Sequence, residues 1–436
     1  MSTIDARQVP VDATSAERLA ARGLTYRSVD ASSDEYTDYY RAVARGFLDA
    51  EPGEKELAAA RDSSLQPPER LVGVYDDTET DGFPVGTVAS WLTPLTIPGG
   101  TLDMWAISGV TVAGTHRRRG IARAMLEGEL RAAAGAGVPI AGLTVTEATI
   151  YGRYGFGSAV PVVGLVVDAA RAGWRSYEPK ATVRYVSRER LAEAFAETGA
   201  AQTAVGTTPT WPGRRQEYAG THPAVKDGEK IRGVVATDAD GRVVGAMSYR
   251  LAFDGDYTKH TLTIGHIETV TPDAYAALWR FALSHDLVAT VKARLQPVDG
   301  TLPFLVADPR AVQATPGDHV WLRILDLPRA LEARTYSGEG TSHAVNAAGV
   351  LGVHDPLGFA HGTWRVEIEA GSARVFPTEM DADVELGIAD LSAAFLGGTS
   401  LQGLADAGRV SGSASALERI DAALRGPRAP RHGFVF

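Results

Sequence analysis

The chain has 436 residues, of which 44% are hydrophobic and 22% charged, and its formal net charge is −10 with a pI near 5.5. This composition is typical of globular proteins, and the length predicts two to four domains. The acidic balance argues against nucleic-acid binding, and the absence of cysteine excludes disulfides and thiolate chemistry. No signal peptide or apolar run of membrane-spanning length is found, so we expect a cytoplasmic protein without a membrane partner.

Residues 1–23 are expected to form an arm or an added helix. Alternating and β-branched runs then predict strands, with one aromatic-rich helix after the first of them. The expected strands are Leu24–Val29, Leu71–Tyr75, Pro84–Pro94, Thr101–Val112 and Pro139–Val145. This order predicts one α/β unit with a largely antiparallel sheet.

The stretch Ile107–Ala122, ISGVTVAGTHRRRGIA, predicts a strand, a tight turn and the start of an amphipathic helix. A helix start has unpaired N–H groups and a partial positive charge, and both favour a diphosphate. Gly120 has no Cβ to keep a phosphate away from the backbone. Arg117, Arg118 and Arg119 add planar guanidinium groups that each bind two phosphate oxygens. The turn therefore predicts a nucleotide-bearing cofactor, and the alternative is an ordinary basic helix start in water.

A second region, 161–325, has a similar order of elements. Strands are expected over Ile231–Thr237, Val243–Leu251 and Thr261–Val270, followed by a helix over Pro272–His285. The start of this helix carries Asp273 in place of arginines and glycine, and a carboxylate there would repel a diphosphate. We interpret the region as a degraded repeat without cofactor, and an unrelated α/β domain is the alternative.

The last region, 326–436, changes character. Short strands are expected over Val366–Glu369, Ala373–Phe376, Asp381–Glu385 and Arg409–Gly412. Helices are expected over Gly387–Leu396 and Ala414–Leu424, with a further element ending at Ala407. This pattern resembles the end of sterol-carrier-like domains.

The run Arg117-x-x-Gly120-x-Ala122 resembles the acetyl-CoA signature of the GNAT N-acetyltransferases. Together with IYGRYGFG (Ile150–Gly157) and the terminal GFVF (Gly433–Phe436), it resembles the enhanced intracellular survival family of actinobacterial acetyltransferases. The resemblance implies an α/β (α+β) fold with tandem GNAT domains and a sterol-carrier-like domain. The implied divisions are an arm over 1–23, a catalytic domain over 24–160, a degenerate GNAT-like domain over 161–325, and a C-terminal domain over 326–436.

The resemblance also implies roles for individual residues. The motif strand would pair with the pantetheine arm of acetyl-CoA through the backbone of Ser108, Gly109, Val110, Thr111 and Val112. The diphosphate would lie on Arg117, Arg118, Arg119, Gly120 and Ile121. Thr146 would also touch the cofactor. Tyr151 would act as general acid and the terminal carboxylate of Phe436 as general base.

These roles agree with elementary acid–base chemistry. An alkyl amine has a pKa near 10, so it must lose a proton before it attacks a thioester, and a nearby carboxylate accepts that proton. A tyrosine stays protonated at pH 7 and is a proton donor for the departing thiolate. The apolar residues Phe434–Phe436 favour burial of the C-terminus. The alternative to a catalytic role is that this end of the chain is buried for packing only. For Tyr151 and Tyr154, likewise, the alternative is that they are core aromatic residues without a catalytic role.

The acceptor, the assembly and two alternative functions follow from the resemblance or stay open beside it. The resemblance suggests aminoglycosides and related polycationic amines as acceptors and a homo-hexamer as the assembly. The alternatives are a tRNA-dependent aminoacyltransferase of the tandem-GNAT type and a non-enzymatic lipid or sterol carrier. The ten histidines show no ligand spacing for zinc, and His116 is expected to cap or solvate the turn. Four acids after the first helix are expected on a solvated face or along the approach of an amine; they are Asp49, Glu51, Glu54 and Glu56.

Overall fold

The computed structural model describes residues 4–79, 82–175, 177–253, 255–337 and 346–436. The chain divides into two compact units. The first contains the chain through Val160, His319–Pro430 and Phe436, and the second contains Pro161–Asp318 and Arg431–Val435. Within the described residues, no helix is both long and apolar enough to cross a bilayer.

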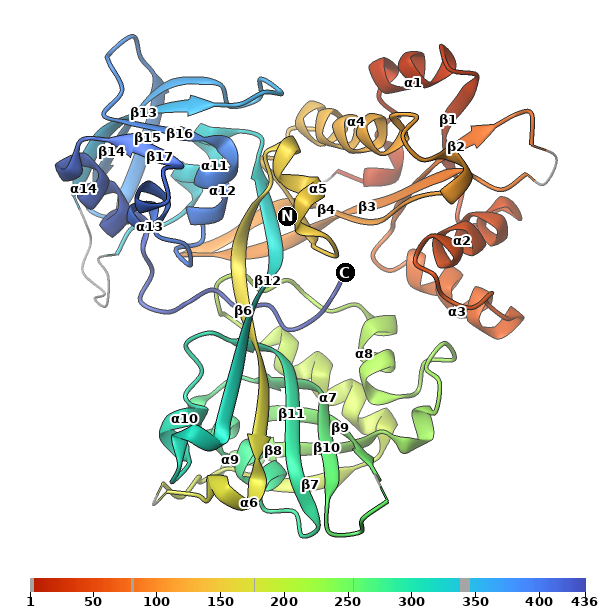
Figure 1. Ribbon diagram of the computed structural model, residues 1–436, viewed down its shortest axis with the longest axis vertical. Coiled ribbons are helices and arrows are strands. Elements are labelled where there is room, and N and C mark those ends of the chain that lie inside the picture. Colours follow the sequence, from red (N-terminus) through yellow and green to blue (C-terminus); the bar gives the residue numbers. More distant parts are fainter. Residues whose placement is uncertain (1–3, 80–81, 176, 254, 338–345) are drawn as a thin grey trace. The chain divides into compact units, whose positions relative to one another are not determined.

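The N-terminal half of the first unit is a mainly antiparallel sheet with helices packed on it (Figure 1). Its strands lie in the order β1-β2-β3-β4-β5-β12. They are β1 (Leu24–Val29), β2 (Arg70–Asp76), β3 (Gly86–Ile97), β4 (Gly100–Val112), β5 (Ile140–Thr144) and β12 (Val312–Ile324). The helices are α1 (Ala13–Ala20), α2 (Glu35–Gly46), α3 (Glu54–Ser64), α4 (Ile121–Gly135) and the one-turn α5 (Ala148–Tyr151). The five expected strands are confirmed to within a few residues, and α1 is the expected added helix.

The helix after the arginine turn is held by its predicted apolar face. Ile121, Met125, Leu126 and Leu130 are at most 1% exposed and lie in one hydrophobic cluster. Burial of four such side chains contributes roughly 6–12 kcal/mol before the cost of ordering the chain. Because β4 and β5 are parallel neighbours, α4 is the crossover that joins them.

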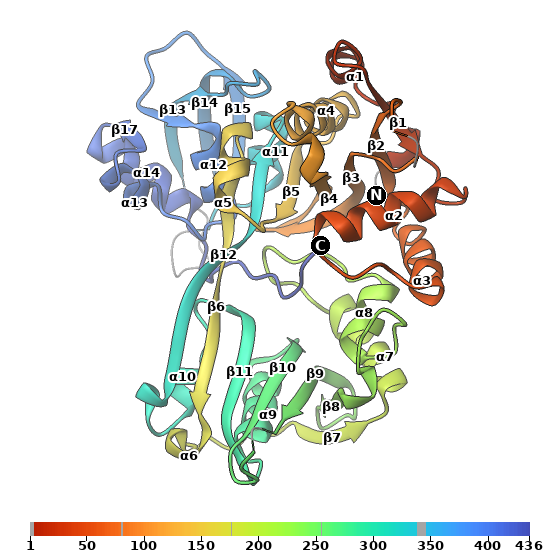
Figure 2. The same cartoon turned by 45° about the vertical axis from the view of Figure 1, so that its right-hand side comes forward.

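The C-terminal part of the first unit is a five-stranded sheet in the order β15-β14-β13-β16-β17 (Figure 2). Its strands are β13 (Ala347–His354), β14 (Gly362–Glu369), β15 (Ser372–Pro377), β16 (Val384–Gly387) and β17 (Val410–Gly412). Its helices are α11 (Leu327–Ala333), α12 (Ile388–Ala394), α13 (Leu401–Asp406) and α14 (Ala414–Leu424).

Two expectations for this sheet were inaccurate. The strand placed at Asp381–Glu385 begins at Val384, because the Asp383 carboxylate turns back to accept the backbone N–H of Val350. The strand β13 was not expected at all, although it pairs with both β14 and β16. Helix α11 was not expected either, whereas the other elements lie within a few residues of where the sequence placed them.

The second unit repeats the arrangement of a mainly antiparallel sheet with one parallel pair. Its strand order is β6-β11-β10-β9-β8-β7, and the parallel pair is β10 with β11. The strands are β6 (Gly157–Asp168), β7 (Thr182–Val186), β8 (Arg232–Thr237), β9 (Val243–Ala252), β10 (His260–Thr269) and β11 (Val288–Pro297). The helices include α6 (Ala169–Ala172), α7 (Arg188–Ala200), α8 (Pro212–Ala219), α9 (Pro272–Leu283) and α10 (Leu302–Leu305). The crossover α9 buries Trp279 completely, so this tryptophan is a core residue.

Candidate functional site

Strand β4 carries a bulge near its end. Thr87 pairs with Thr111 and Ala89 pairs with Ser108, so two residues of β4 stand opposite one residue of β3. Gly109, one of the extra pair, has φ +60°, which favours glycine. The Thr87 hydroxyl fixes the bulge by donating to the Gly109 carbonyl at 2.8 Å.

The bulged segment has a free edge. Pairing of β4 with β5 covers only Met104–Ala106, so the later backbone of β4 has no ladder partner on that side among the described strands. Ser108, Gly109, Val110 and Val112 are half-buried, whereas Thr111 is buried. An extended amide chain such as pantetheine fits the unpaired N–H and C=O groups of such an edge.

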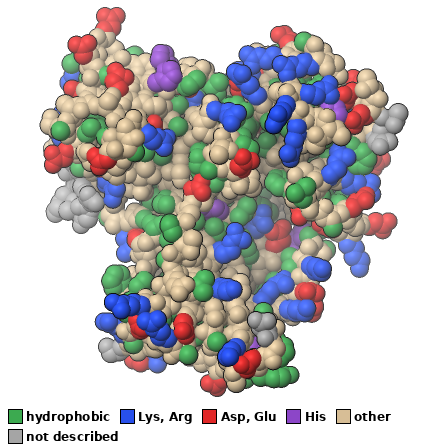
Figure 3. Space-filling model, viewed as in Figure 1, with side chains coloured by type: hydrophobic (Ala, Val, Ile, Leu, Met, Phe, Trp, Pro, Cys, Tyr) green, Lys and Arg blue, Asp and Glu red, His purple; other side chains and the backbone are tan. Residues whose placement is uncertain are grey.

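The turn into α4 has the form of an anion site. Gly120 is the N-cap with φ +76°, and Arg118 also lies in the left-handed region with φ +62°. No side chain caps the helix, so the N–H groups of its first turn remain open to a ligand. Arg117 and Arg118 are exposed, and Figure 3 shows Lys and Arg side chains gathered over the face where α1 and α4 lie. These features fit the diphosphate of coenzyme A.

Beneath this turn lies a carboxylate that sequence reasoning missed. Asp76, the last residue of β2, accepts from His116 Nε2 at 3.1 Å and from Arg119 Nη1 at 3.3 Å. Hydrogen bonds from Thr78, His116 and Arg119 hold the pKa of Asp76 well below its usual range. The expectation that His116 solvates or caps the turn is wrong, because its ring is buried and its Nδ1 lies 2.8 Å from the Thr115 hydroxyl.

Tyr151 ends the short helix α5 and is only 7% exposed. Burial raises the pKa of Tyr151, and a hydrogen bond with Thr146 lowers it by less than burial raises it. The ring packs edge-on against Phe156, with 6.1 Å between the centroids. The structure therefore places the expected acid near the expected cofactor contact Thr146, with the phenol protonated at neutral pH.

The last residue of the chain is buried as expected, and so is Phe434, whereas Val435 between them is exposed. The Phe436 N–H donates to Thr144 Oγ1 at 3.1 Å, and the Thr144 hydroxyl in turn donates to a terminal oxygen of Phe436. The Phe436 ring lies edge-on to Trp91, with 5.8 Å between centroids. Thr144 is the last residue of β5 and lies two residues before Thr146. The terminal carboxylate and the Thr146–Tyr151 pair are thus both attached to the end of β5.

In the second unit, the helix that corresponds to α4 is α9, and side chains and backbone groups of the same chain occupy its start. The Asp273 carboxylate of α9 accepts from the Tyr177 hydroxyl at 2.7 Å and from the N–H groups of Lys180 and Ala181 at 3.0 and 2.7 Å. Thr271 caps the helix by accepting from Ala274 N–H at 3.1 Å. The Thr271 cap thus uses one first-turn N–H group of the kind that has no side-chain cap in α4, and the Asp273 carboxylate binds Tyr177, Lys180 and Ala181 at the same helix start.

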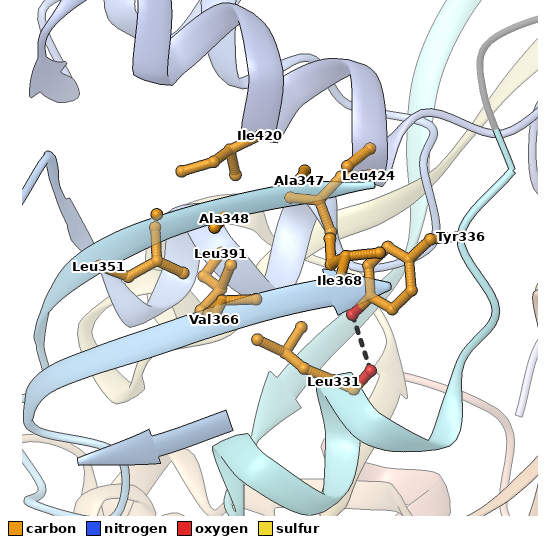
Figure 4. Close-up of a pocket in the computed structure, with 12 residues that line it drawn as sticks. Leu331, Tyr336, Ala347, Ala348, Leu351, Val366, Ile368, Leu391, Ile420 and Leu424 are labelled. Carbon is orange, nitrogen blue, oxygen red and sulfur yellow. Dashed lines mark hydrogen bonds between the residues drawn. The ribbon is translucent and has the colours of Figure 1, made fainter. Parts of the chain in front are cut away.

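The C-terminal domain contains one apolar cavity of about 20 Å³. The Tyr336 hydroxyl donates to the Leu331 carbonyl at 2.7 Å and so points away from the cavity (Figure 4). Neither of these two polar groups is therefore directed into the cavity. A space of this size holds about one water molecule, whereas drug-sized ligands need roughly 300–1,000 Å³. The cavity therefore gives little support to a sterol carrier. Among the described residues, no group of three or more His, Asp or Glu side chains is placed to hold a metal.

Comparisons with known proteins agree with this geometry. Models of an acetyltransferase (GNAT) domain match residues 26–159 and 209–324, and a sterol carrier protein domain matches 327–431. An uncharacterized N-acetyltransferase of Streptomyces griseus is 36% identical over 91% of this chain and 96% of its own length. The N-acetyltransferase Eis of Mycobacterium tuberculosis is 30% identical over 90% and 95% of the two chains.

Solved structures show the same likeness over nearly the whole chain. Eis1 from Mycobacterium abscessus has a TM-score of 0.77 and 26% identity, covering 95% of this chain and all of its own. A GCN5-related N-acetyltransferase from Kribbella flavida has a TM-score of 0.71 and 25% identity over the same shares. All three domains therefore have relatives of known fold.

Proposed function

Since the chain belongs to the family of GNAT N-acetyltransferases that includes Eis, we propose that it acetylates amines of small polycationic molecules such as aminoglycosides. The chain is an acetyltransferase with two GNAT domains and a sterol carrier-like domain. The proposed divisions are an arm over 1–23 and domains over 24–160, 161–325 and 326–436. We further propose that it acts in the cytoplasm as a homo-hexamer, which sedimentation of the full chain would test.

The observation that carries the proposal is the open helix start beside the bulged strand. When bound, acetyl-CoA supplies the acetyl thioester. The backbone of Ser108–Val112 would hold the pantetheine arm, and the residues Arg117–Ile121 would hold the diphosphate through N–H groups and guanidinium donors. Thr146 would hold the cofactor near the phenol of Tyr151, whose pKa it affects.

The terminal carboxylate of Phe436 is proposed as the general base. An α-carboxyl group has a pKa of roughly 3.3–3.7, so it is ionised at neutral pH and accepts a proton from the attacking amine, directly or through one water. The net acidity of the chain favours the approach of a polycation.

Tyr151 is proposed as the general acid. Full proton transfer from a tyrosine to a thiolate is uphill by about 1.5 pKa units, and the burial of Tyr151 increases the gap. We therefore propose that the hydroxyl stays protonated until the carbon–sulfur bond breaks. It then stabilises the growing charge on sulfur by hydrogen bonding, with proton transfer late in the step.

The test is acetyl-CoA consumption against a panel of amines that includes aminoglycosides, with Tyr151→Phe and a chain extended by one glycine after Phe436. Both variants should lose most of the turnover while still binding coenzyme A. Full turnover in both would refute the assignment of acid and base. Thermal-shift measurements with acetyl-CoA, tRNA and a sterol separate the alternatives, because a ligand that binds only the folded chain raises its Tm. Stabilisation by tRNA or a sterol but not by acetyl-CoA would refute the proposed function.

A further inference from the structure

The first helix of the chain lies outside the part that matches the GNAT domain, which begins at residue 26. Nevertheless α1 packs along α4, the helix that begins at the arginine turn (Figures 1 and 2). Three side-chain contacts join the two helices: Asp12 with Arg131 at 2.9 Å, the Ser15 hydroxyl with the Ala124 carbonyl at 2.6 Å, and Arg18 with Glu127 at 2.7 Å. The residue before α1 therefore lies beside the last turns of α4, and the segment after α1 lies at the start of α4.

Arg22, one residue beyond the C-cap of α1, reaches that turn. Its Nη1 donates to the carbonyl of Arg119, and a Cβ built on Gly120 would lie 2.5 Å from the same nitrogen. The side chain of Arg22 therefore covers the open side of Gly120, where the backbone has no side chain of its own.

The guanidinium of Arg22 keeps unused donors. The arginine side chain carries five N–H donors, and within the described part of the chain the side chain of Arg22 makes no other hydrogen bond or ion pair. Arg119, by contrast, is paired with Asp76, so part of its charge is already neutralised. Arg22 is exposed, so it can change rotamer without disturbing the core.

We propose that Arg22 binds the diphosphate of coenzyme A, so that the helix added before the GNAT domain completes the cofactor site. This inference rests on the proposed function. The planar fork of Arg22 would bind two phosphate oxygens beside Gly120, together with the N–H groups in the first turn of α4. The contact between Arg22 and the Arg119 carbonyl holds the fork at the site before the cofactor arrives.

The test is the equilibrium affinity for coenzyme A, measured by calorimetry on the full chain at low salt. Arg22→Ala should raise the Kd about tenfold, as expected for one charge-assisted contact at a partly exposed site. Arg22→Lys should recover part of the affinity, because it keeps the charge and loses the fork. The matched control is Arg18→Ala, which removes another exposed arginine, four residues earlier in α1, and should leave the Kd within about twofold.

The phosphate that Arg22 binds is identified with dephospho-coenzyme A, which lacks the 3′-phosphate. The Arg22→Ala penalty should be equal for both compounds if the diphosphate is the partner. A penalty that disappears with the dephospho compound would overturn the diphosphate assignment. A Kd for Arg22→Ala equal to that of Arg18→Ala would overturn the inference. A wild-type chain that fails to bind coenzyme A would instead overturn the proposed function.

Discussion

The hydroxyl of Thr144 is the group that attaches the end of the chain to β5, and Thr144→Val removes it with little change in volume. Thr144 accepts the Phe436 N–H at 3.1 Å and donates to a terminal oxygen of the same residue. One neutral and one charge-assisted hydrogen bond together contribute about 2–4 kcal/mol when buried. Because the Phe436 ring stays packed against Trp91 in the variant, we expect a loss near the lower end.

A loss of about 2 kcal/mol lowers the ratio of docked to released chain ends by a factor of roughly 30. If the Phe436 carboxylate is the base, kcat/KM for the amine should fall by up to this factor at saturating acetyl-CoA. The Kd for coenzyme A should stay unchanged, because Thr144 is not part of the turn before α4.

The control for this prediction is Thr198→Val, which removes another buried threonine hydroxyl, bonded to the Ala194 carbonyl at 2.9 Å in α7. It should cost about 1 kcal/mol of stability and leave kcat/KM near the wild-type value. If Thr144→Val and Thr198→Val give the same kcat/KM, the hydroxyl of Thr144 does not hold a catalytic terminus, and the reasoning is refuted.

Three further predictions concern the first unit. Burial raises the pKa of Tyr151, so any loss of rate from its ionisation should have its midpoint at a higher pH than an ordinary tyrosine shows, and Tyr151→Phe should abolish this alkaline loss in a pH–rate profile; an alkaline loss that persists unchanged in the variant would show that it does not come from the phenol. Glu129→Ala leaves the fully buried Arg70 without its carboxylate, so urea unfolding should show a loss of about 3–5 kcal/mol, and a loss below 1 kcal/mol would contradict it. Gly157→Ala should destabilise the chain by about 1–3 kcal/mol, because the Cβ of the new alanine would overlap the Ala389 carbonyl oxygen. An unchanged Tm would show that α12 can shift at no cost in stability.

The sequence by itself determined the local parts of the catalytic domain. A β-branched run, a glycine, three arginines and an apolar 3.6-residue period are all local signals, and β4, the turn and α4 lie where they were predicted. The short helical segment that carries Tyr151 was not predicted, because four residues are too few to show a period. Elements without a clear period were missed, among them β12, whose segment VQATPGDHVWLRI contains proline and glycine and does not alternate.

The tertiary structure alone decided which distant side chains meet at the site. Phe436 and Thr144 are 292 residues apart in the chain, and Arg22 and Arg119 are 97 apart. Asp76 meets His116 and Arg119 across about 40 residues, which turns a histidine expected in water into a buried support for the turn. Periodicity reports which face of one element is buried, whereas these contacts depend on how elements pack against one another. A hydrogen bond between two such elements leaves no repeating pattern in the residues that make it.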